Sequence, residues 1–273
     1  MTQTPLKEAL QTRYKEVQNH FCLGIDPDFT KLPEHLKTKP EPLYEFGKEI
    51  LEQCGNLPLA IKPNIAFYEA FGSDGILQFE KTLEFVKKLF PTLPILADCK
   101  RGDLANTAKE YAKYFFDVLG VSAVTISPYM GKDSIVPFLE KGSVYLLCLT
   151  SNPSSSDLQR LELKDGMLFY EKVIQMALEL NDQFPGRLGL VVGATHPKEL
   201  GEIHRSAKEL PLLIPGYGAQ GGDLNEILGE LTGELFTINS SRSVIFASSG
   251  LDYASIAKRK VLEILSEMKS FHS

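Results

Sequence analysis

Residues 94–118 read PILADCKRGDLANTAKEYAKYFFDV, a short apolar run followed by a charged turn and a helical repeat. The run at 94–98 is short, rich in Ile and Leu, and bounded by a proline, which is typical of a buried parallel strand. Beyond the turn, five apolar residues recur at spacings of four and three, which puts them on one helix face: Leu104, Ala108, Tyr111, Phe115 and Val118. This stretch therefore predicts one β-strand followed by one α-helix.

The same alternation recurs along the whole chain. Helical spacing returns at 76–90 and 254–268, and strands that alternate with helices indicate a parallel sheet. Eight strand candidates, with a helical stretch after most of them, predict a closed (β/α)8 TIM barrel that spans 1–273 as a single domain; a doubly wound open sheet is the alternative. The seven further strand candidates are 21–25, 58–62, 122–126, 144–149, 188–193, 211–214 and 235–239.

Composition and charge exclude several classes of protein. The 273 residues are 43% hydrophobic and 23% charged, as in an ordinary globular protein, and the net charge of −6 argues against a nucleic-acid partner. No apolar run approaches the roughly 18 residues that span a bilayer, so we expect no membrane association. Cys22, Cys54, Cys99 and Cys148 lack CxxC spacing, which predicts buried thiols in a reducing cytoplasm. The histidines show no HExxH spacing, so we expect no metal site.

Charged residues gather at the end of the third predicted strand. In a barrel, active-site groups come from the C-terminal ends of strands. Since side chains alternate between faces, Leu96, Asp98 and Lys100 share one face, which would point two opposite charges into the barrel mouth. Lys62 on the neighbouring strand and Asp103 past the turn would extend them to an alternating Lys-Asp-Lys-Asp array. A plain ion-pair network, with Asp103 as a helix cap, is the alternative, but four charges converging on strand ends favour function.

A glycine-rich turn follows the seventh predicted strand. Residues 216–221, GYGAQG, match the dinucleotide pattern GxGxxG, but they come late in the chain and no acidic strand end follows about 20 residues later. A phosphate cradle fits better, because barrels often bind phosphate with the loops after strands seven and eight. Gln220 would add a donor, and Arg242 at the next strand end a permanent charge. A flexible turn is the alternative.

Two further polar residues lie at predicted strand ends. Asp26 follows the first strand, and we favour a ligand role for it over a loop cap. Ser151 follows the fifth strand and could equally be a turn residue.

Together these motifs resemble the orotidine 5′-monophosphate decarboxylase family, and more closely its longer bacterial subfamily, over essentially the whole chain. The most specific segments are 24–28 (GIDPD), 62–64 (KPN), 98–103 (DCKRGD) with Thr107, and 218–222 (GAQGG). The resemblance implies a homodimeric barrel that converts orotidine 5′-monophosphate to uridine 5′-monophosphate and carbon dioxide in pyrimidine biosynthesis, without metal or cofactor.

The resemblance also implies a role for each charged residue of the array. Asp26 and Lys62 would hold the ribose hydroxyls, Asp98 would face the substrate carboxylate, and Lys100 would protonate C6. Loss of carbon dioxide leaves a carbanion at C6 that no adjacent carbonyl can delocalise. A fixed ammonium at that position therefore fits the chemistry, since it can both stabilise the charge and deliver the proton.

The remaining expected contacts also follow from the resemblance. Asp103 and Thr107 would be donated by the other subunit to the ribose side, so that the active sites are shared. Ser151 would contact the pyrimidine. The phosphate would be bound by Gln220, Arg242 and Ser241, the last standing where many relatives have glycine.

Three rival functions remain at this point. A magnesium-dependent sugar-phosphate lyase of the same barrel group looks similar around Asp98, Lys100 and Asp103, but generally carries an acidic residue in place of Lys62. A non-catalytic nucleotide-binding barrel would not need Lys100. A Schiff-base aldolase requires a lysine of lowered pKa in an apolar pocket, whereas Lys62 and Lys100 both have carboxylates nearby.

Overall fold

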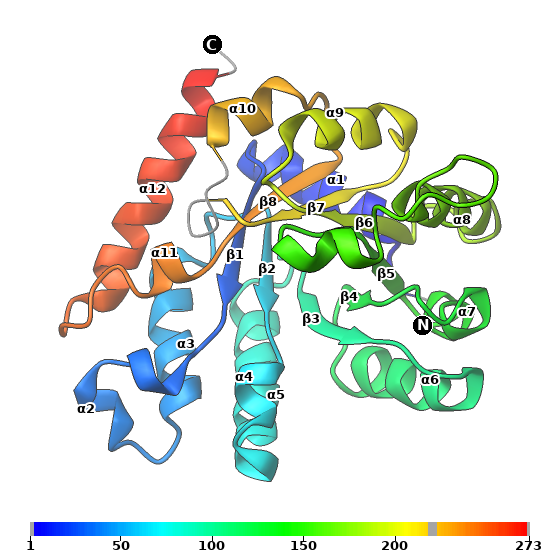
Figure 1. Ribbon diagram of the computed structural model, residues 1–273. Helices are drawn as coiled ribbons and strands as arrows, with labels where there is room; N and C mark the ends of the chain where they lie inside the picture. Colours follow the sequence, from blue (N-terminus) through cyan, green and yellow to red (C-terminus); the bar gives the residue numbers. More distant parts are fainter. Residues whose placement is uncertain (1–2, 218–222, 272–273) are drawn as a thin grey trace.

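Eight parallel strands form the centre of the computed structural model, which describes residues 3–217 and 223–271 (Figure 1). The strands pair in the order β2-β1-β8-β7-β6-β5-β4-β3, and single bridges from Ile61 to Ile95 and from Asn64 to Asp98 join the two outer strands. This confirms the predicted (β/α)8 barrel. The strands are β1 Phe21–Ile25, β2 Ala60–Pro63, β3 Leu96–Arg101, β4 Ala123–Ile126, β5 Ser143–Leu149, β6 Leu188–Val192, β7 Leu212–Pro215 and β8 Phe236–Ser240.

Helices surround these strands in Figure 1. None of the described helices is long and apolar enough to cross a membrane. Cys22, Cys54, Cys99 and Cys148 are buried free thiols, as predicted. The helices are α1 Leu6–Val17, α2 Glu34–Lys37, α3 Pro42–Cys54, α4 Ala66–Glu69, α5 Gly72–Leu89, α6 Ala105–Ala112, α7 Val136–Leu139, α8 Phe169–Gln183, α9 Pro197–Ser206, α10 Leu224–Gly229, α11 Arg242–Ile245 and α12 Tyr253–Phe271.

Helix α1 closes the N-terminal end of the barrel. Its Leu6 and Leu10 are fully buried and belong to the apolar cluster inside the barrel, together with Leu96 and Tyr145. Arg13, on the same helix, donates hydrogen bonds to the carbonyl of Pro58 ahead of β2. With this end covered, the described residues leave a cavity at the C-terminal ends of the strands.

The helix that follows β3 buries residues of its predicted apolar face in the middle but not at either end. Ala108 and Phe115 are buried as predicted, but Leu104 is 59% exposed and Val118 is 61% exposed. Leu104 only caps the helix, and residues Lys113–Val118 form a π-helical turn rather than an α-helical one. Because a π-turn holds more residues per turn than an α-turn, Val118 rotates away from the core.

Candidate active site

A cavity of about 300 Å³ opens at the C-terminal ends of the strands. Apolar side chains from β5, β6 and β7 form one part of its wall, and polar side chains from the remaining strands form another. Residues that follow β5, β7 and β8, among them Ser151, Tyr217 and Arg242, add to the lining. Every strand, or the residue directly after it, contributes a lining side chain: Asp26, Lys62, Asp98, Thr125, Leu147, Val191, Leu213 and Asn239.

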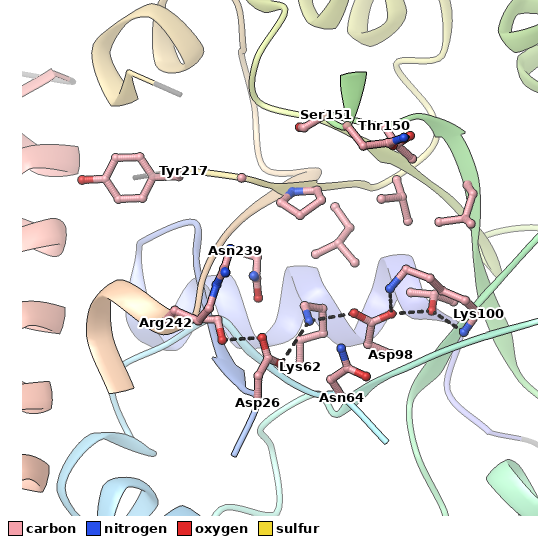
Figure 2. A pocket seen from close by; sticks show the side chains of 18 residues that line it. Asp26, Lys62, Asn64, Asp98, Lys100, Thr150, Ser151, Tyr217, Asn239 and Arg242 are labelled. Carbon is pink, nitrogen blue, oxygen red and sulfur yellow. Dashed lines mark hydrogen bonds and ion pairs between the residues drawn. The ribbon is translucent and has the colours of Figure 1, made fainter. Parts of the chain in front are cut away.

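A row of charged side chains lies along one side of this cavity (Figure 2). Lys62 Nζ donates to Asp98 Oδ2 at 2.9 Å and lies 3.8 Å from Asp26 Oδ1. Lys100 Nζ donates to the other oxygen of the same carboxylate, Asp98 Oδ1, at 2.5 Å. The structure thus brings together three of the four residues in the predicted Lys-Asp-Lys-Asp array, and adds Asp26 at its end.

Burial and charge act in opposite directions on the pair at the centre of this row. Burial alone would lower the pKa of Lys62, but the carboxylates of Asp26 and Asp98 outweigh it and raise that pKa. Burial would likewise raise the pKa of Asp98, but Lys62 and Lys100 outweigh it and hold that pKa well below its usual range. Both groups are therefore ionised at neutral pH.

The two lysines differ sharply in exposure. The Lys62 side chain is 5% exposed, whereas the Lys100 side chain is 53% exposed and borders the open part of the cavity. Lys100 also has a left-handed backbone, with φ of 43°, a conformation that costs a non-glycine residue roughly 1–2 kcal/mol. Strand alternation correctly places Asp98 and Lys100 on the cavity side, but it does not predict this backbone.

Three of the residues predicted to bind ribose and phosphate lie beside β1 and β8: Asp26, Ser241 and Arg242. The Ser241 hydroxyl donates to Asp26 Oδ2, and Arg242 begins α11 at the rim of the cavity. Gly24 makes this approach possible, because a Cβ at that position would lie 2.6 Å from the Ser241 Cβ. Figure 2 shows Ser151 across the cavity from the charged row. Its buried Oγ has no hydrogen-bond partner within the described chain.

Two predicted residues, Asp103 and Thr107, do not line the cavity that the described residues form, and a third, Gln220, is not among the described residues. Asp103 accepts a hydrogen bond from the backbone N–H of Leu104 at 2.7 Å, and Thr107 is exposed on α6. Gln220 falls outside the described residues. Tyr217, the last described residue before it, borders the cavity.

One important cavity residue was not among the predicted site residues. Thr125, in the middle of β4, donates to Asp98 Oδ1 at 2.9 Å. Thr125 lies within an apolar run rather than in the polar segment after it, so the pattern of polar strand ends does not predict it. The sequence does contain one indication of this role. Thr125 stands two positions after Ala123, so the two side chains share one face of a strand that pairs with β3.

Metal-binding groups do not gather in the part of the chain that the structure describes: no three His, Cys, Asp or Glu side chains come together as a possible ion site. The two carboxylates that line the cavity, Asp26 and Asp98, both face the ammonium of Lys62. The arrangement offers a fixed cation beside a fixed anion, with a second, more exposed cation at the cavity mouth.

Comparison with known proteins assigns the family. Residues 19–252 match the family model described as orotidine 5′-phosphate decarboxylase / HUMPS family. The orotidine 5′-phosphate decarboxylase of Leptospira interrogans is 47% identical over 262 residues, covering 95% of this chain and 94% of that one, and its namesake from Herpetosiphon aurantiacus is 45% identical over 241 residues, covering 87% and 88%. The solved structure of Leishmania donovani OMP decarboxylase superposes with a TM-score of 0.82 at 33% identity, covering 98% of this chain and 99% of that one. The chain belongs to the orotidine 5′-phosphate decarboxylase / HUMPS family.

Proposed function

We propose that this chain decarboxylates orotidine 5′-monophosphate to uridine 5′-monophosphate, the reaction of pyrimidine biosynthesis for which its relatives are named, and that it does so as one barrel domain without a cofactor. The observation that carries the proposal is the buried Lys62–Asp98 pair with Lys100 on the same carboxylate. The family model also includes HUMPS proteins, so the substrate must be decided by the site. The ammonium of Lys62 stands within 4 Å of both cavity carboxylates, where it opposes binding of a divalent cation.

The cavity suggests one orientation for the nucleotide. Its phosphate would lie at the rim near Arg242, with help from Ser241 and Gln220. Arg242 supplies a permanently charged, planar donor group that suits phosphate. The ribose hydroxyls would then reach Asp26 and Lys62 at the start of the charged row.

The pyrimidine would fill the remaining space between the charged row and Ser151. The buried Ser151 Oγ lacks a partner within the described chain, and a polar edge of the base would satisfy it. This orientation directs the substrate carboxylate toward Asp98 and the C6 atom toward Lys100.

Charge stabilisation and proton delivery would both come from Lys100. The bond between C6 and the carboxylate carbon breaks, its electron pair stays on C6, and carbon dioxide leaves. The ammonium of Lys100 stabilises that pair and transfers a proton to C6, and the lysine then regains a proton from solvent. Asp98 holds the ammonium in place before the reaction, and Lys62 holds Asp98, so little reorganisation is needed when the charge appears.

We infer further that the enzyme is a homodimer with shared sites, in which Asp103 and Thr107 of one subunit complete the cavity of the other. Support comes from their position just past β3, where Asp103 is half-buried, Thr107 is exposed, and the apolar side chain of Leu104 between them is exposed. A two-fold dimer would make the donation reciprocal. The four free buried thiols suit a reducing cytoplasm.

A direct assay tests the function. Purified protein is mixed with orotidine 5′-monophosphate, and the loss of its absorbance is followed with and without excess chelator. The same preparation is offered a hexulose 6-phosphate with magnesium. We expect decarboxylation that survives chelation and no turnover of the sugar phosphate. Activity that vanishes with chelator and returns with magnesium, or turnover of the sugar phosphate alone, would assign the lyase function instead.

A further inference from the structure

The pairing of β3 with β4 contains an irregularity next to the charged row. Ala97 pairs with Val124 and Arg101 pairs with Ile126, so three residues of β3 face the single residue Thr125 of β4. Such a bulge interrupts the backbone ladder and leaves N–H groups without their usual carbonyl partners. In this structure, the side chain of Thr125 takes the place of those partners.

The hydroxyl of Thr125 is fully used in this arrangement. It accepts hydrogen bonds from the backbone N–H groups of Cys99 and Lys100, both at 3.1 Å, and lies 2.9 Å from Asp98 Oδ1. A hydroxyl has two acceptor positions and one proton. Because the two N–H groups occupy both acceptor positions, the proton must point to Asp98. Thr125 itself is 2% exposed, so water does not compete for these bonds.

Two features of Lys100 are thus fixed by one side chain. Its backbone N–H, at the left-handed φ of 43°, bonds to the Thr125 hydroxyl. Its Nζ bonds to the same Asp98 oxygen that the hydroxyl holds. Without the hydroxyl, the strained backbone would lose an acceptor and Asp98 would lose a donor.

We propose that Thr125 is a positioning residue: its hydroxyl holds the β3 bulge and Asp98 so that the Lys100 ammonium stands where the proton is delivered. This inference rests on the proposed decarboxylase function. Thr125 acts through Lys100 and Asp98, so its removal lowers turnover rather than nucleotide affinity. A displacement of about 1 Å in a reacting group can cost roughly 100-fold in rate.

The test compares isosteric and conservative changes. Thr125→Val keeps the shape and removes the hydroxyl, Thr125→Cys replaces it with a weaker hydrogen-bonding thiol, and Thr125→Ser restores it. Thr237→Val is the matched control, because Thr237 is a fully buried strand threonine of β8 whose hydroxyl donates to the carbonyl of Leu212 and does not line the cavity. For each folded variant, kcat on orotidine 5′-monophosphate and the Kd for uridine 5′-monophosphate are measured.

We expect kcat to fall roughly 10- to 100-fold in Thr125→Val, with Thr125→Ser near wild type, Thr125→Cys between them and the Kd changed less than about threefold. Thr237→Val should keep its kcat. A Thr125→Val enzyme with kcat within about threefold of wild type would overturn the proposal. So would Thr125→Ser or Thr237→Val losing as much as Thr125→Val. If Thr125→Val fails to fold, the two remaining variants decide. A higher kcat for Thr125→Ser than for Thr125→Cys supports the proposal, and equal or reversed values overturn it.

A crystal structure separates this proposal from the assignment of function. If the wild-type protein proves inactive, the proposed function has failed, but the positioning claim can still be examined. In Thr125→Val, or in Thr125→Cys if the valine variant does not fold, residue 100 should leave the left-handed region and its Nζ should move away from Asp98. An unchanged backbone and an unchanged Nζ position would overturn the proposal.

Discussion

Replacing Lys62 by methionine removes a buried charge and leaves most of the side-chain volume in place. The Lys62 side chain is 5% exposed and that of Asp98 is 8% exposed, so Lys62→Met leaves a carboxylate oxygen in a low-dielectric site without its cation. Removing one partner of a buried pair costs about 3–5 kcal/mol. Asp98 keeps Lys100 and Thr125 as donors, so we expect the lower end, about 3 kcal/mol of unfolding free energy.

Lys100→Ala is the matched control, because it removes a cation from the same carboxylate. Its side chain is 53% exposed, and exposed pairs contribute about 0.2–1 kcal/mol. Equilibrium denaturation by urea measures both variants against wild type at one protein concentration. In the double variant Lys62→Met with Asp98→Asn, the buried side chain at position 98 carries no charge. Its unfolding free energy should therefore recover part of what Lys62→Met alone loses. A Lys62→Met protein within about 1 kcal/mol of wild type, or one more stable than Lys100→Ala, would refute the reasoning.

Three further predictions concern phosphate, pH and assembly. Arg242→Ala should raise the Kd for uridine 5′-monophosphate roughly 10- to 100-fold by calorimetry, because a charged hydrogen bond to phosphate is lost; an unchanged Kd would remove Arg242 from the site. The folded pKa of Asp98 lies below its unfolded value of about 3.9, so its contribution is present above that pH and is lost as the pH falls through the folded pKa. Asp98→Asn should therefore flatten the decline of unfolding free energy between about pH 4 and pH 2, and an equally steep decline would contradict the assigned shift. Refolded mixtures of inactive Lys100→Ala and Asp103→Asn should regain roughly a quarter of the wild-type sites if the sites are shared, and verified mixed dimers without activity would place Asp103 within its own subunit.

The barrel and the charged row were predictable because they follow from patterns that repeat. Each predicted strand run overlaps an observed strand, since short apolar segments that alternate with helical stretches are typical of a parallel sheet covered by helices. Asp98 and Lys62 were predictable because strand alternation fixes which face a side chain takes.

Other features depend on contacts between elements, which the alternation of side chains along one strand does not predict. The bulge at Lys100 arises from the pairing of β3 with β4. Val118 leaves the predicted apolar face of its helix because a π-turn changes the number of residues per turn. The sequence does not predict the role of Thr125, because that role comes from two backbone N–H groups that a regular ladder would have satisfied. The roles of Asp103 and Thr107 depend on a partner subunit, and they stay predictions.

The turnover of Lys100→Ala tests the central claim most directly. Orotidine 5′-monophosphate is given in excess, with chelator present, and kcat is compared with wild type while the Kd for uridine 5′-monophosphate is measured on the same preparations. General acid catalysis contributes about 10²–10⁴-fold and a preorganised charge about 10²–10³-fold, so loss of both should lower kcat by at least about 10⁴-fold while nucleotide affinity largely persists. A Lys100→Ala protein that binds the nucleotide and turns over at a near-normal rate would contradict the assignment of Lys100 as the proton donor.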